Sequence, residues 1–136
     1  MAAFLYDGGR EGFLNGDISW GRDTIKAVML DLGTYSADSA AHRFLSDVPG
    51  GARYGSPVTL ASKTMAAGVA DAADCSVTGI TAAPTLEGIL IYQDTGDAST
   101  SRLIALIDQA TGLPVAGGAT QADIAWSNGA TKIFKL

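Results

Sequence analysis

Two apolar runs in the last third of the chain predict a pair of antiparallel strands. Residues 86–93 (LEGILIYQ) and 102–108 (RLIALID) are mostly apolar, and eight polar or turn-forming residues separate them. Apolar runs of this length that are bounded by turn-forming residues are typical of buried strands. We therefore expect a hairpin here.

Shorter apolar stretches predict further strands earlier in the chain. Residues 24–31 (TIKAVMLD) indicate a buried strand with apolar side chains on both faces. One face carries Ile25, Ala27 and Met29, and the other carries Val28 and Leu30.

Four other stretches are less regular. Residues 57–63 and 74–80 read as strands, and residues 17–20 read as a short extended piece. Residues 64–73 fit either a bulged strand or a loop, because helix and strand patterns are poorly separated there.

Two short helices are expected. Residues 4–15 form an apolar arm and a short helix, with Asp7 as a cap and Gly16 as the residue that ends it. Residues 36–46 predict a second helix, which Pro49 follows.

Three glycines, Gly8, Gly9 and Gly12, lie inside the first of these helices. Each weakens a helix by about 1 kcal/mol relative to Ala. The N-terminal segment therefore needs a surface to dock on.

The dipeptide Asn128-Gly129 predicts a second hairpin, because both residues tolerate the positive φ of a type I′ turn. The flanking strands are residues 121–127 and 130–136. A two-residue loop places Trp126 opposite Thr131 and Ile124 opposite Ile133, on a face that we assign to the core.

Six or seven strands with little helix indicate a mainly β fold. We expect a small antiparallel β-sandwich or barrel with one or two short helices. The expected organisation is an N-terminal arm and short helix over residues 1–16 and a single β-rich domain over residues 17–136.

Composition and charge narrow the function. Hydrophobic residues make up 47% of the 136 residues and charged residues 17%, which excludes a disordered chain. The net charge is −5 and the nine Lys and Arg are scattered, so neither nucleic acid nor a membrane surface is an expected partner. No apolar run reaches the length of a spanning helix, and the first ten residues have no signal-peptide pattern.

The tripeptide Asp94-Thr95-Gly96 follows an apolar strand, as the catalytic motif of aspartic proteases does. Asp97 and Gln93 stand where the protease pattern has a small and an aliphatic residue. A turn explains the same residues, because Asp94 can bond its own backbone and Gly96 can supply positive φ. We therefore predict a surface loop and no protease.

Other candidate chemistry is sparse, and we predict no catalytic, cofactor-binding or metal-binding residues. His42 is the only histidine, and Cys75 is the only cysteine and is expected to be a small buried hydrophobe. These two alone cannot form a zinc site. Two acidic pairs, Asp94–Asp97 and Asp71–Asp74, could offer oxygens to calcium, but neither follows the calcium-loop pattern.

Large apolar residues crowd the glycine-rich N-terminus. The candidate interface residues are Phe4, Leu5, Tyr6, Phe13, Leu14 and Trp20. They fit two interpretations: a hydrophobic staple folded back on the domain, or an anchor in the groove of a partner.

The order of several phrases resembles a family of small virion structural proteins of tailed bacteriophages, of the head decoration or cement type. The phrases are LYDGGREGFLNGDISW, DTIKAVMLD, VPGGARYGSPVTLASKTMAAGVADAADCSVTGI, LIYQDTGDASTSRLIALIDQATGLPV and WSNGATKIFKL. The family favours a helix former where this chain has Gly9 and Gly12.

The resemblance implies a non-enzymatic virion protein that is made in a bacterial cytoplasm. As a decoration protein it would bind the outer head surface. Its expected partners are the major capsid protein and copies of itself, with a trimer as the candidate oligomer. The alternative in the same particle is a tail or neck component: a tube, an adaptor or a fibre base. A protease and a free sugar-binding β-module are the alternatives outside it.

Overall fold

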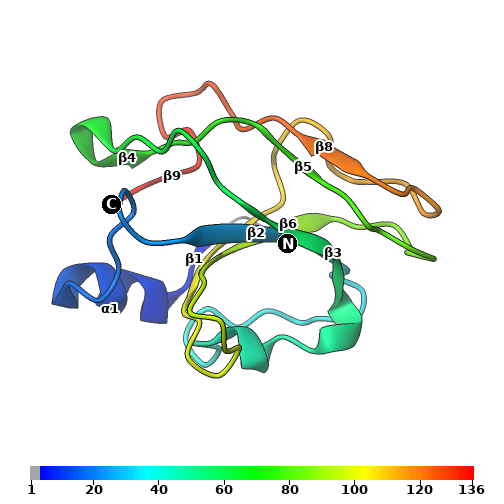
Figure 1. Cartoon of the computed structure of the whole chain (residues 1–136), viewed down its shortest axis with the longest axis horizontal. Coiled ribbons are helices and arrows are strands. Elements are labelled where there is room, and N and C mark those ends of the chain that lie inside the picture. Colours follow the sequence, from blue (N-terminus) through cyan, green and yellow to red (C-terminus); the bar gives the residue numbers. More distant parts are fainter. Residues whose placement is uncertain (1–3) are drawn as a thin grey trace.

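The computed structural model describes residues 4–136, which build one open five-stranded antiparallel sheet and the layers that cover it (Figure 1). In spatial order the strands of this sheet are β1 (Phe4–Leu5), β7 (Leu103–Ile107), β6 (Gly88–Gln93), β2 (Ile25–Leu30) and β3 (Arg53–Thr59). The predicted hairpin of β6 and β7 is confirmed. The predicted strand over residues 24–31 is confirmed as β2, which lies between β6 and the edge strand β3.

The two faces of the central sheet are both buried, as the pattern in β2 predicts. Ile25, Ala27 and Met29 belong to the larger hydrophobic cluster, whereas Val28 and Leu30 belong to a smaller cluster on the other face. Successive side chains of a strand point to opposite faces of the sheet, so a strand that is covered on both sides is apolar at most positions.

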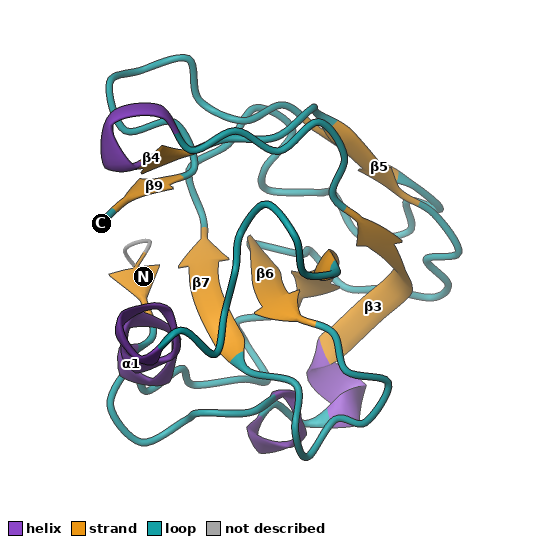
Figure 2. Ribbon diagram, turned by 60° about the vertical axis from the view of Figure 1, so that its left-hand side comes forward, coloured by secondary structure: helices purple, strands orange, loops and turns teal. Residues whose placement is uncertain are grey.

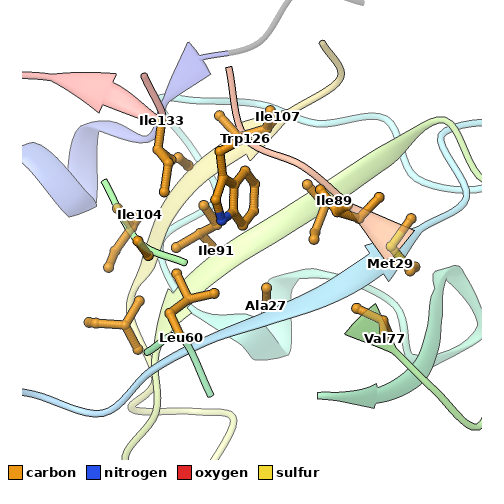
Figure 3. Packing of buried hydrophobic residues seen from close by; sticks show 14 of the residues in the cluster. Ala27, Met29, Leu60, Val77, Ile89, Ile91, Ile104, Ile107, Trp126 and Ile133 are labelled. Carbon is orange, nitrogen blue, oxygen red and sulfur yellow. The ribbon is translucent and has the colours of Figure 1, made fainter. Parts of the chain in front are cut away.

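Two small antiparallel sheets cover the face that carries the larger cluster (Figures 1 and 2). One pairs β4 (Val69–Ala70) with β9 (Phe134–Lys135), and the other pairs β5 (Cys75–Val77) with β8 (Ala122–Ile124). Trp126, which follows β8, reaches down between these layers to Ile91 of the central sheet (Figure 3).

The predicted Asn128-Gly129 hairpin is wrong. Its two arms pair with different strands, β8 with β5 and β9 with β4, and the turn lies after Gly129 rather than at it. Gly129 does not adopt positive φ, and its N–H binds the Ser127 hydroxyl. The residues assigned to the core, Ile124, Trp126 and Ile133, are nevertheless buried, whereas Thr131 is exposed.

The helix predicted over residues 36–46 is also wrong. The Asp38 side chain accepts from the N–H groups of Ala40 and Ala41, which closes a local turn. Farther on, Leu45 N–H donates to the carbonyl of Ser101. This pairing with a distant segment replaces the hydrogen bonds that a helix would make.

The segment over residues 31–52 instead covers the smaller cluster. It carries two short 3-10 helices, η1 (Leu45–Asp47) and η2 (Gly50–Ala52), and it buries Tyr35, Leu45 and Val48 against the sheet. In Figure 1 it forms the layer below the central strands.

The only α-helix within residues 4–136, α1 (Asp7–Asn15), confirms the N-terminal helix. Tyr6 occupies the N-cap position, so Asp7 is the first helical residue rather than the cap. Gly16 ends the helix with φ 79°, as expected. The helix packs on β7, and β1 pairs with β7, so residues 4–16 of the predicted arm are part of the same fold. Residues 1–3 of that arm lie outside the described residues.

The remaining segments match the expectations in part. β5 lies within residues 74–80, and β3 begins earlier than residue 57. Residues 64–73 contain the 3-10 helix η3 (Ala66–Gly68) and β4, whereas residues 17–20 form no strand. The mainly β fold with a short helix is confirmed, and the finer sandwich or barrel stays a prediction.

Candidate interaction surface

Three large hydrophobic residues stand out because they are exposed. They are Leu14 (89% exposed), Met65 (52%) and Leu136 (59%). They come from α1, from the loop before η3 and from the residue after β9, yet all three line one stretch of surface. Exposed large apolar residues that gather in one place typically mark an interaction surface.

This surface is a series of three adjoining hollows, which we call the α1–β9 groove. The middle hollow, about 360 Å³, is lined by Leu5, Arg10, Phe13, Leu14, Lys135 and Leu136. An inner hollow, about 190 Å³, is lined by Phe13, Trp20, Met65, Gly68, Ala70, Phe134 and Leu136. An outer hollow, about 290 Å³, is lined by Phe4, Leu5, Arg10, Ala105, Ile107, Thr131, Ile133, Phe134 and Lys135.

Aromatic packing fixes the floor of the groove. Trp20 meets Phe134 edge to face, with ring centroids 5.2 Å apart, and Phe13 contacts Phe134 from the helix side at 5.9 Å. The Trp20 indole N–H donates to the Asp71 carbonyl at 3.2 Å, which fixes the ring. The floor is therefore rigid, whereas Leu14 stands free at the end of α1.

Two cations stand at the groove. Arg10 and Lys135 each line both the middle and the outer hollow. Arg10 forms an exposed ion pair with Asp7 at 3.1 Å within α1. Lys135 has no ion-pair partner among residues 4–136, so this part of an acidic protein carries local positive charge.

The candidate interface residues divide between the groove and the interior. Five of the six, namely Phe4, Leu5, Phe13, Leu14 and Trp20, line the groove. Tyr6 is fully buried in the smaller cluster on the other face of the sheet. Leu5 and Trp20 are also buried and expose only their edges, so these three residues follow the staple interpretation rather than that of a free anchor.

Sequence reasoning missed five residues that line the groove. Arg10, Met65, Phe134, Lys135 and Leu136 complete it. Phe134 and Leu136 were assigned to a hairpin whose register placed them elsewhere. Only the pairing of β9 with β4 brings them beside α1, and no local pattern reveals that pairing.

The Asp94-Thr95-Gly96 segment is the predicted turn. Gly96 has φ 86°, and its N–H donates to Asp94 Oδ1 at 3.1 Å. The other carboxylate oxygen pairs with Lys26 Nζ at 3.1 Å. The Gly96 N–H and, to a smaller extent, Lys26 hold the pKa of Asp94 below its usual range, so the carboxylate is ionised and occupied by structural bonds.

His42 lies at the end of a chain of hydroxyl groups rather than on a helix. Tyr6 Oη and Tyr35 Oη are 3.0 Å apart, and Tyr35 Oη is 2.9 Å from His42 Nδ1. Nδ1 also lies 3.1 Å from the Asp38 N–H, which donates to it. Burial raises the pKa of both tyrosines, so their hydroxyl groups stay neutral. Their hydrogen bond joins the N-terminal segment to the segment over residues 31–52.

The remaining candidate residues have structural partners. Cys75 is partly buried, and burial raises the pKa of its thiol to about 11. Asp74 accepts from the Trp126 N–H, and Asp71 lies 3.8 Å from Lys132. Among residues 4–136, no three His, Cys, Asp or Glu side chains come together in a group that could hold a metal ion.

No protein-family model matches the chain, and the curated proteins contain no match to it. Within the described part of the chain, no helix combines the length and the apolar character needed to cross a membrane.

Proposed function

We propose that this chain is a non-enzymatic structural protein of a tailed-bacteriophage virion, and that it decorates the outer surface of the head. The observation that carries the proposal is the α1–β9 groove, where Leu14, Met65 and Leu136 are exposed together. These exposed apolar side chains do not stabilise the isolated domain. A subunit of a larger assembly, in contrast, can bury them against its partner.

The charge of the chain is consistent with an exterior position. A net charge of −5 repels packaged DNA, whose phosphates bind clustered cations instead. The proposed partners are the major capsid protein and further copies of this chain, with a trimer at a symmetric site as the candidate oligomer. Many modest contacts on one shell add through avidity.

The alternative is a tail or neck component, such as a tube, an adaptor or a fibre base. A tube subunit would use a long free loop to reach the next ring, and residues 33–57 are the candidate. Much of that segment is occupied within the domain, because Tyr35, Leu45, Val48 and Ala52 are buried against the central sheet. This favours decoration over the tube.

The copy number in purified virions tests the proposal. We expect about as many copies as of the major capsid protein. An intermediate number would support the tail tube, and a few copies would support the neck or a fibre base. Absence from the virion would overturn the proposal.

A binding assay with particles that lack this protein tests the attachment surface. Leu14→Glu should abolish or strongly weaken attachment without unfolding the domain, because the side chain is almost fully exposed. Thr120→Glu adds the same charge at an exposed position outside the groove and should attach normally. Equal attachment of the two variants would show that the groove is not part of the contact with the particle.

A further inference from the structure

We propose that the α1–β9 groove binds an extended, acidic peptide segment of a partner protein, which adds as a strand at the free edge of β1. The inference rests on the proposed function only for the identity of the partner as a virion subunit. The docking mode follows from the shape, the backbone and the charge of the groove.

The shape favours an extended chain over a flat domain surface. The three hollows adjoin: the middle one shares Leu5, Arg10 and Lys135 with the outer one. It shares Phe13 and Leu136 with the inner one. An extended segment sends every second side chain to the same side, so successive apolar side chains can fill separate hollows. A flat surface of a partner domain would leave the three hollows empty.

The backbone of β1 offers a donor and an acceptor on its free side. In the described part of the chain β1 is an edge strand, and its only neighbour in the sheet is β7. Tyr6 N–H donates to the Ile104 carbonyl, so in this antiparallel register the N–H and C=O of Leu5 point away from β7. Leu5 also lines the middle and outer hollows, which places these groups at the wall of the groove.

Figure 2 shows β1 and β9 near one another on the same side of the molecule, with no strand between them. A partner strand at the edge of β1 would lie over the outer hollow, which residues of β1, β7 and β9 line together. Strand addition of this kind takes affinity from main-chain hydrogen bonds and specificity from pockets for alternate side chains.

The local charge indicates that the segment is acidic. Arg10 and Lys135 flank the middle and outer hollows, and Lys135 is unpaired within residues 4–136. Within residues 4–136, Asp7 is the only carboxylate paired with either, in an exposed pair that screens Arg10 in part. A second copy of this chain is the alternative occupant, and a measurement of self-association separates it from the peptide.

A binding experiment with the full chain and two designed peptides tests this inference. The first peptide alternates leucine and threonine between glutamates at both ends, and the second has lysines in place of the glutamates. We expect the glutamate peptide to shift the backbone amide signals of Leu5, Leu14 and Lys135 in a two-dimensional NMR titration. It should bind tighter than the lysine peptide by about threefold or more.

Charge reversal supplies the matched control. Lys135→Glu should lower the affinity for the glutamate peptide and raise the affinity for the lysine peptide. Arg22→Glu changes the net charge equally at an exposed position outside the groove and should leave the preference unchanged. Equal affinity of both peptides for the wild-type chain, or shifts confined to other surfaces, would overturn the inference, as would the absence of binding at millimolar peptide.

Self-association is the remaining outcome to separate. A dimer in sedimentation that Leu14→Glu dissociates would assign the groove to a second copy and overturn the peptide proposal. None of these measurements uses virions, so a protein that binds the peptide but is absent from virions would overturn only the proposed function.

Discussion

Gly9 of α1 lies directly against the backbone of Leu103 in β7. A Cβ at Gly9 would come within 2.7 Å of the Leu103 carbonyl oxygen and 3.0 Å of the Ile104 Cα. Neither atom belongs to a flexible side chain, so the helix or the strand would have to move. The glycine that weakens the isolated helix is therefore the residue that lets it dock.

Gly9→Ala is expected to destabilise the domain, although Ala favours a helix by about 1 kcal/mol over Gly. The overlap with backbone atoms outweighs that gain, and we expect a net loss of about 1–3 kcal/mol. Urea denaturation followed by circular dichroism measures it. Gly51→Ala is the control, because a Cβ there meets no atom within 4 Å. A Gly9→Ala protein as stable as the wild type would refute the close approach.

The same contact explains how much of the N-terminus could be predicted. The C-terminal end of the helix followed from a local signal, since Gly16 takes the left-handed conformation that ends α1, whereas the cap predicted at Asp7 lies at Tyr6. The need for a docking surface followed from Gly8, Gly9 and Gly12. The identity of that surface could not be predicted from the sequence, because Leu103 lies far along the chain and no local pattern links it to Gly9.

The failed predictions share one physical cause. Asn128-Gly129 has the local preference for a hairpin, yet Phe134 gains burial by pairing with Ala70 instead. The segment at Leu45 has caps for a helix, yet its N–H binds Ser101. In both places a distant segment competes successfully with the local preference, whereas the β6–β7 hairpin was predictable because its local and tertiary pairings agree.

Trp126→Ala should destabilise the domain by about 3–5 kcal/mol. The side chain is buried beside Ile91, and its indole N–H donates to the Ala73 carbonyl at 3.1 Å (Figure 3). Thermal and urea denaturation measure the loss. Trp126→Phe keeps most of the apolar contact and loses the hydrogen bond, so its cost should be clearly smaller. Equal melting curves for wild type and Trp126→Ala would contradict the core placement.

Tyr35→Phe should cost more stability than Tyr6→Phe. Tyr35 Oη lies between Tyr6 Oη and His42 Nδ1, so its removal leaves the buried Tyr6 hydroxyl without a partner. An unsatisfied buried hydroxyl costs about 1–3 kcal/mol, whereas the loss of one hydrogen bond costs about 0.5–1.5 kcal/mol. Urea denaturation of both single variants measures the order.

The double variant Tyr6→Phe, Tyr35→Phe provides the internal control. Once Tyr6 has no hydroxyl, Tyr35→Phe no longer leaves a buried hydroxyl without a partner. In that background Tyr35→Phe should therefore lower the stability by less than it does in the wild type. Strict additivity of the two single losses would show that the hydroxyl groups do not interact.

Removal of residues 1–15 should unfold or strongly destabilise the domain. The deletion removes Tyr6 from the smaller cluster, β1 from the edge of β7 and the helix that covers Leu103. Circular dichroism and the cooperativity of urea denaturation report the loss. A truncated chain that melts like the full one would show that the segment is a separable anchor.

Asp94→Asn tests the turn and gives a pH dependence whose sign follows from the depressed pKa of Asp94. Asparagine keeps the oxygen that accepts from Gly96 N–H, so only the charge facing Lys26 is lost. Because the ion pair is solvent-accessible, we expect the variant to be less stable at pH 7 by no more than about 1 kcal/mol.

The depressed pKa means that the folded state favours the ionised Asp94. Its contribution is complete above the unfolded pKa of about 3.9 and is lost as the pH falls through the lower folded value. The stability difference between wild type and Asp94→Asn should therefore be constant from pH 7 to about pH 5 and shrink below about pH 4. Urea denaturation at several pH values measures it. A difference that persists unchanged at pH 3 would show that the effect comes from turn geometry rather than from the carboxylate charge.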